Sequence, residues 1–152
     1  MAGMPRALSH ELHKLTRHLD RAAGTLLRRQ FGVSYARFLA LFAVRETGGT
    51  QRDLARWLGQ TEPSTSRMVR ALVDAGLLMA TTAAGAGNRR VLRLTAQGED
   101  LVNACAQFLE GRFEDLVRSS GVPYQAYERY TRRLLQRLEP EQRSSGDLWG
   151  VA

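Results

Sequence analysis

The chain has 152 residues, of which 43% are hydrophobic and 24% charged, a composition typical of one globular domain rather than a disordered or collagen-like chain. Its longest apolar run, Phe38 to Val44, is too short to cross a membrane. Cys105 is the only cysteine, which excludes an internal disulfide, and residues 1–30 carry charges throughout. We therefore expect a cytoplasmic protein without a membrane segment or an export signal.

The net charge is +7, and 21 of the 22 basic residues are arginine. Residues 1–94 carry a net charge of +9, whereas residues 95–152 carry −2. An uneven basic surface is typical of proteins that bind a polyanion, most often nucleic acid, although a solvated basic surface gives the same pattern.

The first third of the chain predicts two helices. A heptad seam with spacings of 4, 3, 4, 3 and 4 predicts one long helix over residues 8–30; its members are Leu8, Leu12, Leu15, Leu19, Ala22 and Leu26. A second helix is predicted over Ser34 to Glu46, and Gly48-Gly49 end it. Its buried stripe is expected to consist of Tyr35, Phe38, Leu39, Leu41 and Phe42.

Two short helices are predicted next, joined by a turn that contains Gly59. The residues Thr50-Gln51-Arg52-Asp53 form a capping box, after which Leu54, Trp57 and Leu58 are expected to face inward. Thr61 can cap the second helix, and Gly76 ends it. The apolar face of this second helix is expected to contain Met68, Val69, Leu72 and Val73. Two capped short helices with this connection are typical of a helix-turn-helix.

The second of these helices begins with polar residues that suit contacts in a DNA major groove. Ser64, Thr65, Ser66 and Arg67, with Arg70 one turn later, are expected to project hydroxyl and guanidinium groups outward. Early Ser and Thr residues can also be simple helix caps.

A short β-hairpin is predicted after the helix-turn-helix. Leu77 to Thr82 and Val91 to Leu94 are the candidate strands, and the tip between them ends in Asn88-Arg89-Arg90. A basic hairpin in this position is a wing that can reach an adjacent minor groove. A solvated loop with stray charges is the alternative.

These segments together resemble the MarR family of winged-helix regulators. The resemblance is carried by Thr50 to Gly59, Ser66 to Leu77, Arg89-Arg90 and Leu94-Thr95-Ala96-Gln97-Gly98, and the order of elements matches over about residues 8–138. It implies a mostly α-helical fold with a winged helix-turn-helix domain and a short β-hairpin wing, flanked by N- and C-terminal dimerisation helices. It further implies a homodimer on a near-palindromic operator of double-stranded DNA, with repression relieved by a small aromatic or phenolic effector.

The expected organisation of residues 1–152 is a single domain of this kind. The dimerisation helices are expected over 8–31 and 99–138, the winged helix-turn-helix over 34–95, its recognition helix over 62–75, the wing over 77–94 and a frayed tail over 141–152. The expected DNA-binding residues are Gln51, Arg52, Ser64, Thr65, Ser66, Arg67, Arg70, Asn88, Arg89 and Arg90.

The wing departs from the family pattern in two ways. Asn88 occupies the place where the family commonly has an Asp before the basic pair, and the return strand to Leu94 is about two residues short. Which arginine enters the minor groove is therefore left open, although the recognition helix keeps the family register from Leu58 to Leu77.

The C-terminal helices have more apolar surface than one small winged domain needs, which favours a homodimer interface built from both chain ends. Packing within one chain is the alternative. The residues concerned are Leu101, Cys105, Phe108, Leu109, Phe113, Leu116 and Val117, followed after Pro123 by Tyr127, Tyr130, Leu134, Leu135 and Leu138.

Other functions have weaker support. The sequence contains no P-loop, dinucleotide fingerprint, nucleophile elbow or metalloprotease motif, so we expect neither an enzyme nor a cofactor. His10, His13 and His18 suggest at most a metal sensor, and Cys105 a redox sensor. A further alternative is a ligand-binding or protein-interaction dimer that no longer reads DNA. Operator sequence, effector and the choice between repressor and activator stay open.

The family precedent places the effector between the first two helices, the fifth helix and the winged domain. The residues that could line such a site are Arg17, His18, Tyr35, Phe38, Phe42 and Trp57, although most of these aromatic residues could equally be plain core.

Overall fold

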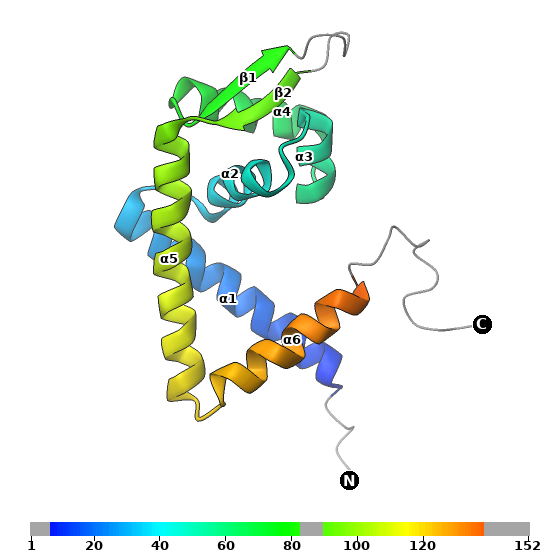
Figure 1. The fold of residues 1–152 in the computed structure, drawn as a ribbon, viewed down its shortest axis with the longest axis vertical. Helices are drawn as coiled ribbons and strands as arrows, with labels where there is room; N and C mark the ends of the chain where they lie inside the picture. Colours follow the sequence, from blue (N-terminus) through cyan, green and yellow to red (C-terminus); the bar gives the residue numbers. More distant parts are fainter. Residues whose placement is uncertain (1–6, 83–89, 139–152) are drawn as a thin grey trace, which may run out of the picture. The chain divides into compact units, whose positions relative to one another are not determined.

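The computed structural model describes residues 7–82 and 90–138. In this part of the chain the element order is α1 (Leu8–Phe31), α2 (Tyr35–Thr47), α3 (Gln51–Leu58), α4 (Glu62–Asp74), β1 (Leu78–Thr82), β2 (Arg90–Leu94), α5 (Ala96–Ser119) and α6 (Tyr124–Leu138) (Figure 1). The predicted fold class, mostly helical with one short hairpin, is confirmed. No described helix is long and apolar enough to span a membrane.

The chain divides into two compact units, and the division falls within α5. The first unit runs to Phe108 and contains α1 to α4, the hairpin and the start of α5. The second unit begins at Leu109 and contains the rest of α5 and α6.

Side-chain caps fix where the short helices of the first unit begin. The hydroxyl of Thr50 accepts the N–H of Asp53, and the Asp53 carboxylate accepts the N–H of Thr50, which completes the predicted capping box of α3. The hydroxyl of Thr61 accepts the N–H of Ser64 at the start of α4. Between the two helices Gly59 has φ of +62°, a left-handed conformation that favours glycine. The predicted helix-turn-helix is therefore confirmed in its local chemistry.

The core of the first unit draws one or two side chains from almost every element. The largest fully buried side chains are Leu27, Leu41, Thr65, Leu72, Leu78, Leu92, Val102 and Cys105. Because α1, α2, α4, both strands and α5 all contribute, burial of this core fixes α4 against the rest of the unit.

Trp57 was expected to face inward, but 46% of it is exposed. The helix α3 buries Leu54 and Ala55, with Leu58 partly covered. At about 100° of rotation per residue, Trp57 lies at the edge of the face that these three residues define. The prediction that Trp57 faces inward was therefore wrong. Val73 of α4 is also partly exposed, for the same reason.

The hairpin is antiparallel, with Leu78 opposite Leu94 and Thr82 opposite Arg90. The segment just before α3 extends this sheet: Thr50 forms an isolated bridge with Val91, and the N–H of Leu92 donates to the Gly49 carbonyl at 3.1 Å. Figure 1 shows the hairpin beside α3 and α4. The base of the wing is thus tied directly to the start of α3.

A close backbone contact joins the end of the hairpin to the end of α4. The Thr95 hydroxyl donates to the Gly76 carbonyl at 2.6 Å and accepts the N–H of Gly98 at 3.0 Å. A Cβ on Gly98 would lie 2.1 Å from the Leu77 carbonyl oxygen. Glycine is therefore required at position 98 for packing, although its backbone is helical.

The second unit holds α5 and α6 together through aromatic and polar contacts. The rings of Phe113 and Tyr127 have centroids 6.2 Å apart, and the Tyr124 hydroxyl donates to Glu110. This hydrogen bond to Glu110 raises the pKa of Tyr124 to about 12, so its phenol stays protonated at neutral pH. No residue of α6 is buried.

We predict that Gly98→Ala lowers the free energy of unfolding, because the added methyl must displace the Leu77 carbonyl. The expected loss is about 1–3 kcal/mol, which outweighs the gain of up to about 1 kcal/mol in helix propensity. Urea unfolding followed by circular dichroism measures it. Gly111→Ala is the matched control on the same helix, since nothing lies within 4 Å of an added Cβ there. Equal stability of the two variants would contradict the packing argument.

Candidate nucleic-acid interface

The helix α4 buries one stripe and exposes the opposite face. Thr65, Val69 and Leu72 are its buried residues, at the spacing i, i+4 and i+7. Arg67 and Arg70 are exposed and lie well away from this stripe around the helix. Ser64 and Ser66, on either side of Thr65, are half-buried. Two guanidinium groups are therefore presented outward by a helix whose rotation is fixed by its core contacts.

Thr65 was expected to project toward DNA, and this is wrong. Its exposed fraction is 0%, and its hydroxyl donates to the Thr61 carbonyl at 3.1 Å. Because that carbonyl belongs to the first turn, the bond satisfies the hydroxyl inside the unit. The signal was present in the sequence, since Thr65 stands four residues before Val69 and seven before Leu72.

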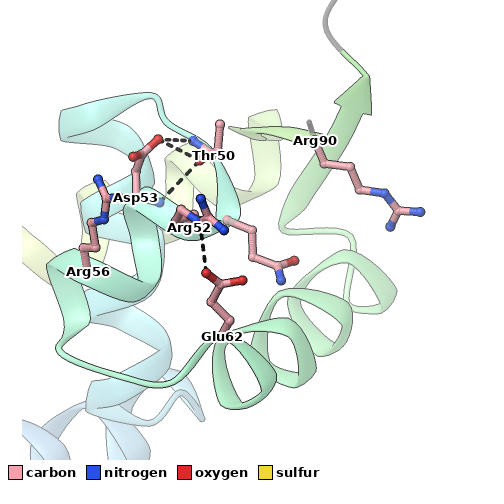
Figure 2. A pocket seen from close by; sticks show the side chains of 7 residues that line it. Thr50, Arg52, Asp53, Arg56, Glu62 and Arg90 are labelled. Carbon is pink, nitrogen blue, oxygen red and sulfur yellow. Dashed lines mark hydrogen bonds and ion pairs between the residues drawn. The ribbon is translucent and has the colours of Figure 1, made fainter. Parts of the chain in front are cut away.

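A hollow of about 460 Å³ lies where α3, α4 and β2 meet (Figure 2). It combines two residues expected at the interface from α3, Gln51 and Arg52, with Arg90 from the wing. Among the described residues, the lining consists of Thr50, Gln51, Arg52, Asp53, Arg56, Glu62 and Arg90. Three guanidinium groups and two carboxylates therefore border one hollow.

Arg56 is a further arginine of this hollow that was not among the residues expected at the interface. It is exposed and follows Arg52 by four residues on α3, so both side chains share one face of that helix. This i, i+4 spacing was the available signal. Arg56 lies in the same hollow as Arg90, which is 34 positions later in the chain and comes from another element.

The two carboxylates that line the hollow, those of Asp53 and Glu62, accept hydrogen bonds from different partners. The Asp53 carboxylate accepts the N–H of Thr50 at 2.9 Å and its hydroxyl at 2.7 Å, so it belongs to the capping box. The Glu62 carboxylate accepts the Nε–H of Arg52 at 3.0 Å. The side chains of Arg52 and Glu62 are 66% and 57% exposed, so this ion pair contributes at most about 1 kcal/mol to stability.

The wing is described only at its base. Arg90 is exposed at the start of β2. Asn88 and Arg89 were expected to bind DNA and lie outside the described residues, as does most of the wing tip and the expected tail over 141–152. The question of which wing arginine enters a groove therefore stays a prediction.

The expected ligand-binding residues are only partly brought together. Tyr35, Phe38 and Phe42 form a row on α2, with ring centroids 6.2 and 5.9 Å apart. Burial, together with a hydrogen bond to the nearby Asp20 carboxylate, raises the pKa of Tyr35 to about 12. Arg17 and His18 are exposed on α1, and Trp57 is exposed on α3.

A second hollow of about 560 Å³ lies elsewhere in the first unit, where the ends of α1 and α4 meet the starts of α2 and α5. None of the six expected ligand-binding residues lines it. Its lining consists of Phe31, Gly32, Val33, Arg37, Ala75, Leu77, Gln97, Asp100 and Leu101.

The histidines and Cys105 were considered as a metal sensor and a redox sensor, and the structure supports neither role among the described residues. Among the described residues, no group of three or more His, Cys, Asp or Glu side chains could hold a metal ion. Cys105 is fully buried, and burial raises the pKa of its thiol. A buried protonated thiol is a poor nucleophile, which argues against a redox-sensing role.

Comparisons with known proteins identify the architecture. A sequence profile described as the MarR family matches residues 31–91, which cover the helix-turn-helix and the start of the wing. MepR, a transcription regulator of the Staphylococcus aureus multidrug efflux pump MepA, has a TM-score of 0.66 at 24% identity, over 87% of this chain and 96% of that chain. A structure of S. aureus MepR in complex with DNA has a TM-score of 0.65 at 24% identity, over 87% and 94% of the two chains.

Wild-type MarR from E. coli, in its apo form, has a TM-score of 0.74 at 19% identity, over 90% of this chain and 100% of that chain. No curated protein matches the chain by sequence. The resemblance to the MarR family is confirmed for the winged-helix segment, and the fold of these regulators extends over nearly the whole chain. The family consists of transcription regulators rather than enzymes.

We predict that Cys105 of the folded protein reacts with a water-soluble disulfide reagent far more slowly than in the unfolded chain, because its thiol is buried and its pKa is raised. Absorbance of the released thiolate at pH 7.5, with and without guanidinium chloride, measures both rates. Fast reaction of the folded protein would instead support the redox-sensor alternative.

Proposed function

We propose that this chain, whose winged-helix segment matches the MarR family, is a sequence-specific regulator that binds double-stranded DNA as a homodimer. The observation that supports it best is the outward face of α4, where Arg67 and Arg70 stand exposed on a helix held by its buried stripe. A rigid helix presenting guanidinium groups is what direct reading of a major groove requires. The cytoplasm, where such DNA lies, is its expected place of action.

Within this proposal the side chains fall into two groups. Arg67, Arg70, Ser64 and Ser66 would enter the major groove, where Arg pairs best with the edge of guanine. Gln51, Arg52, Arg56 and Arg90 would contact the phosphate backbone around the hollow, together with the wing tip that carries Asn88 and Arg89.

The proposed homodimer is supported by apolar side chains that a single chain leaves uncovered. In α6 the exposed fractions of Tyr130, Leu134 and Leu138 are 56%, 59% and 60%. In α1, Leu8, Leu12 and Leu15 of the heptad seam are also exposed. Surfaces of this kind are typical of association interfaces, and a two-fold dimer suits a near-palindromic operator.

We further infer that a small aromatic effector binds this protein, and that its binding releases DNA and relieves repression. The hollow at the end of α4 has a volume suited to a small ligand and is bordered by Arg37 and by apolar side chains such as Phe31 and Leu77. One related structure is a complex of S. aureus MarR with salicylate and kanamycin. The aromatic row on α2 remains the alternative location.

We predict that Arg67→Ala weakens binding to the preferred duplex by about 1–3 kcal/mol and blurs the preferred sequence, because one base contact is lost. Fluorescence anisotropy, with the duplex that the protein enriches from a random pool and a shuffled duplex as control, measures it. A preference of about 10³ or more for the enriched duplex is expected of the wild-type protein.

Arg67→Lys is the matched variant, since it keeps the charge but loses the planar fork of donors. Affinity restored by Lys on both duplexes would show that Arg67 contacts phosphate rather than a base. Equal, weak and strongly salt-dependent binding of the wild-type protein to both duplexes would contradict the proposed function.

We predict that Leu134→Glu dissociates the dimer and reduces operator affinity, because a charge is placed at the centre of the exposed α6 stripe. Sedimentation velocity measures the oligomeric state. Gln136→Glu adds the same charge on the opposite side of α6 and is expected to leave the dimer intact. A monomeric wild-type protein would contradict the proposal directly.

A further inference from the structure

We propose that Glu62 competes with DNA phosphate for the Arg52 guanidinium, so that the Arg52–Glu62 ion pair opens when a duplex binds. This inference rests on the proposed DNA-binding function and adds a residue that sets affinity. Its role would be to weaken binding to every duplex alike, without contributing to the choice of sequence.

The geometry of the pair shows that it is not needed to hold the two helices. Its 3.0 Å bond crosses from α3 to the first residue of α4. Each helix is already anchored in the core by buried residues of its own, Leu54 in α3 and Val69 and Leu72 in α4. Both charged side chains are more than half exposed, so opening the pair costs little and uncovers no buried group.

Glu62 is a carboxylate of the hollow that directly occupies an arginine there, and its negative charge opposes an incoming phosphate. Within the described part of the chain, the structure shows no ion pair for Arg56 or Arg90. The Asp53 carboxylate is engaged by Thr50 in the capping box. The Glu62 carboxylate instead faces the hollow and bonds Arg52 there, as Figure 2 shows. An incoming phosphate would therefore be attracted by the arginines that line the hollow and would have to replace Glu62 at Arg52.

Exchange of the two anions is chemically direct. A phosphate oxygen accepts an Arg N–H as the Glu62 carboxylate does, and Arg pairs well with either group. After the exchange Glu62 remains near the backbone of the DNA as an uncompensated negative charge. Because phosphate contacts carry no sequence information, this cost is equal for operator and non-operator duplexes.

The test is the variant Glu62→Gln, which keeps the shape and removes the charge. We expect it to bind the enriched and the shuffled duplex about three- to tenfold more tightly, with the ratio between them unchanged. The slope of log Kobs against log salt should become steeper by up to about 0.9, because one negative charge has left the interface. Fluorescence anisotropy at salt concentrations from about 50 to about 200 mM measures both the affinities and the slope, because affinity that rests on phosphate contacts falls steeply over this range.

The matched control is Glu46→Gln. The Glu46 side chain is 53% exposed, close to the 57% of Glu62; it pairs with Arg45 at 3.3 Å on α2 and does not line the hollow. The two variants have the same net charge, so a general electrostatic gain would appear in both. Equal affinities of the two variants would overturn the inference, while binding by the wild-type protein would leave the proposed function standing.

A double-mutant cycle with Arg52→Gln tests the exchange itself. Arg52→Gln should lower the affinity for both duplexes equally. In that background Glu62→Gln should raise the affinity by less than about twofold, since Glu62 and phosphate no longer compete for an arginine at position 52. A full gain in the Arg52→Gln background would show that Glu62 repels DNA on its own, and would overturn the exchange. A loss of affinity for the enriched duplex alone in Glu62→Gln would mean that Glu62 reads a base, which would also overturn it.

Discussion

The burial of one stripe of α4 is the constraint on which the proposed interface depends. Thr65, Val69 and Leu72 are held in the core of the first unit, and this fixes the rotation of the helix about its axis. Arg67 and Arg70 are exposed because they stand on the other side of that stripe. A polar residue in the stripe is tolerated because the Thr65 hydroxyl finds an acceptor in the preceding turn, at Thr61. The buried residues of α4 therefore determine which of its residues face outward.

A second set of contacts holds the surroundings of this helix in place. Thr50 participates in the capping box of α3 and also bridges to Val91 of β2, so the start of α3 and the base of the wing cannot move independently. Gly98 allows the start of α5 to approach the Leu77 carbonyl at the end of α4. Arginines from α3 and β2 border one hollow because these backbone contacts bring the two elements together. Preorganisation of this kind lowers the ordering cost of binding.

Much of this could be predicted from the sequence because its signals are local. The capping box, the Thr61 cap, the turn at Gly59 and the hairpin are each specified within a few residues, and all were located correctly. Thr65 and Trp57 were misplaced because hydroxyl and indole groups fit either side of a helix. Only the exact stripe, which depends on the neighbouring elements, decides between the two sides. Which wing arginine would enter a groove could not be predicted from the sequence, since a run of small residues over 83–87 specifies no unique turn.

The Arg52–Glu62 pair lies beyond local rules for a different reason. Its members are ten positions apart on separate helices, so the pair exists only because the turn at Gly59 returns α4 toward the start of α3. Its place in the sequence explains one half of the setting of Glu62, which is an acidic residue in the first turn of a helix, where a negative charge is favourable. The other half is electrostatic: residues 1–94 carry a net charge of +9, which attracts any polyanion regardless of its sequence. In the proposed exchange, Glu62 offsets part of this sequence-independent attraction and leaves the choice of sequence to the outward residues of α4.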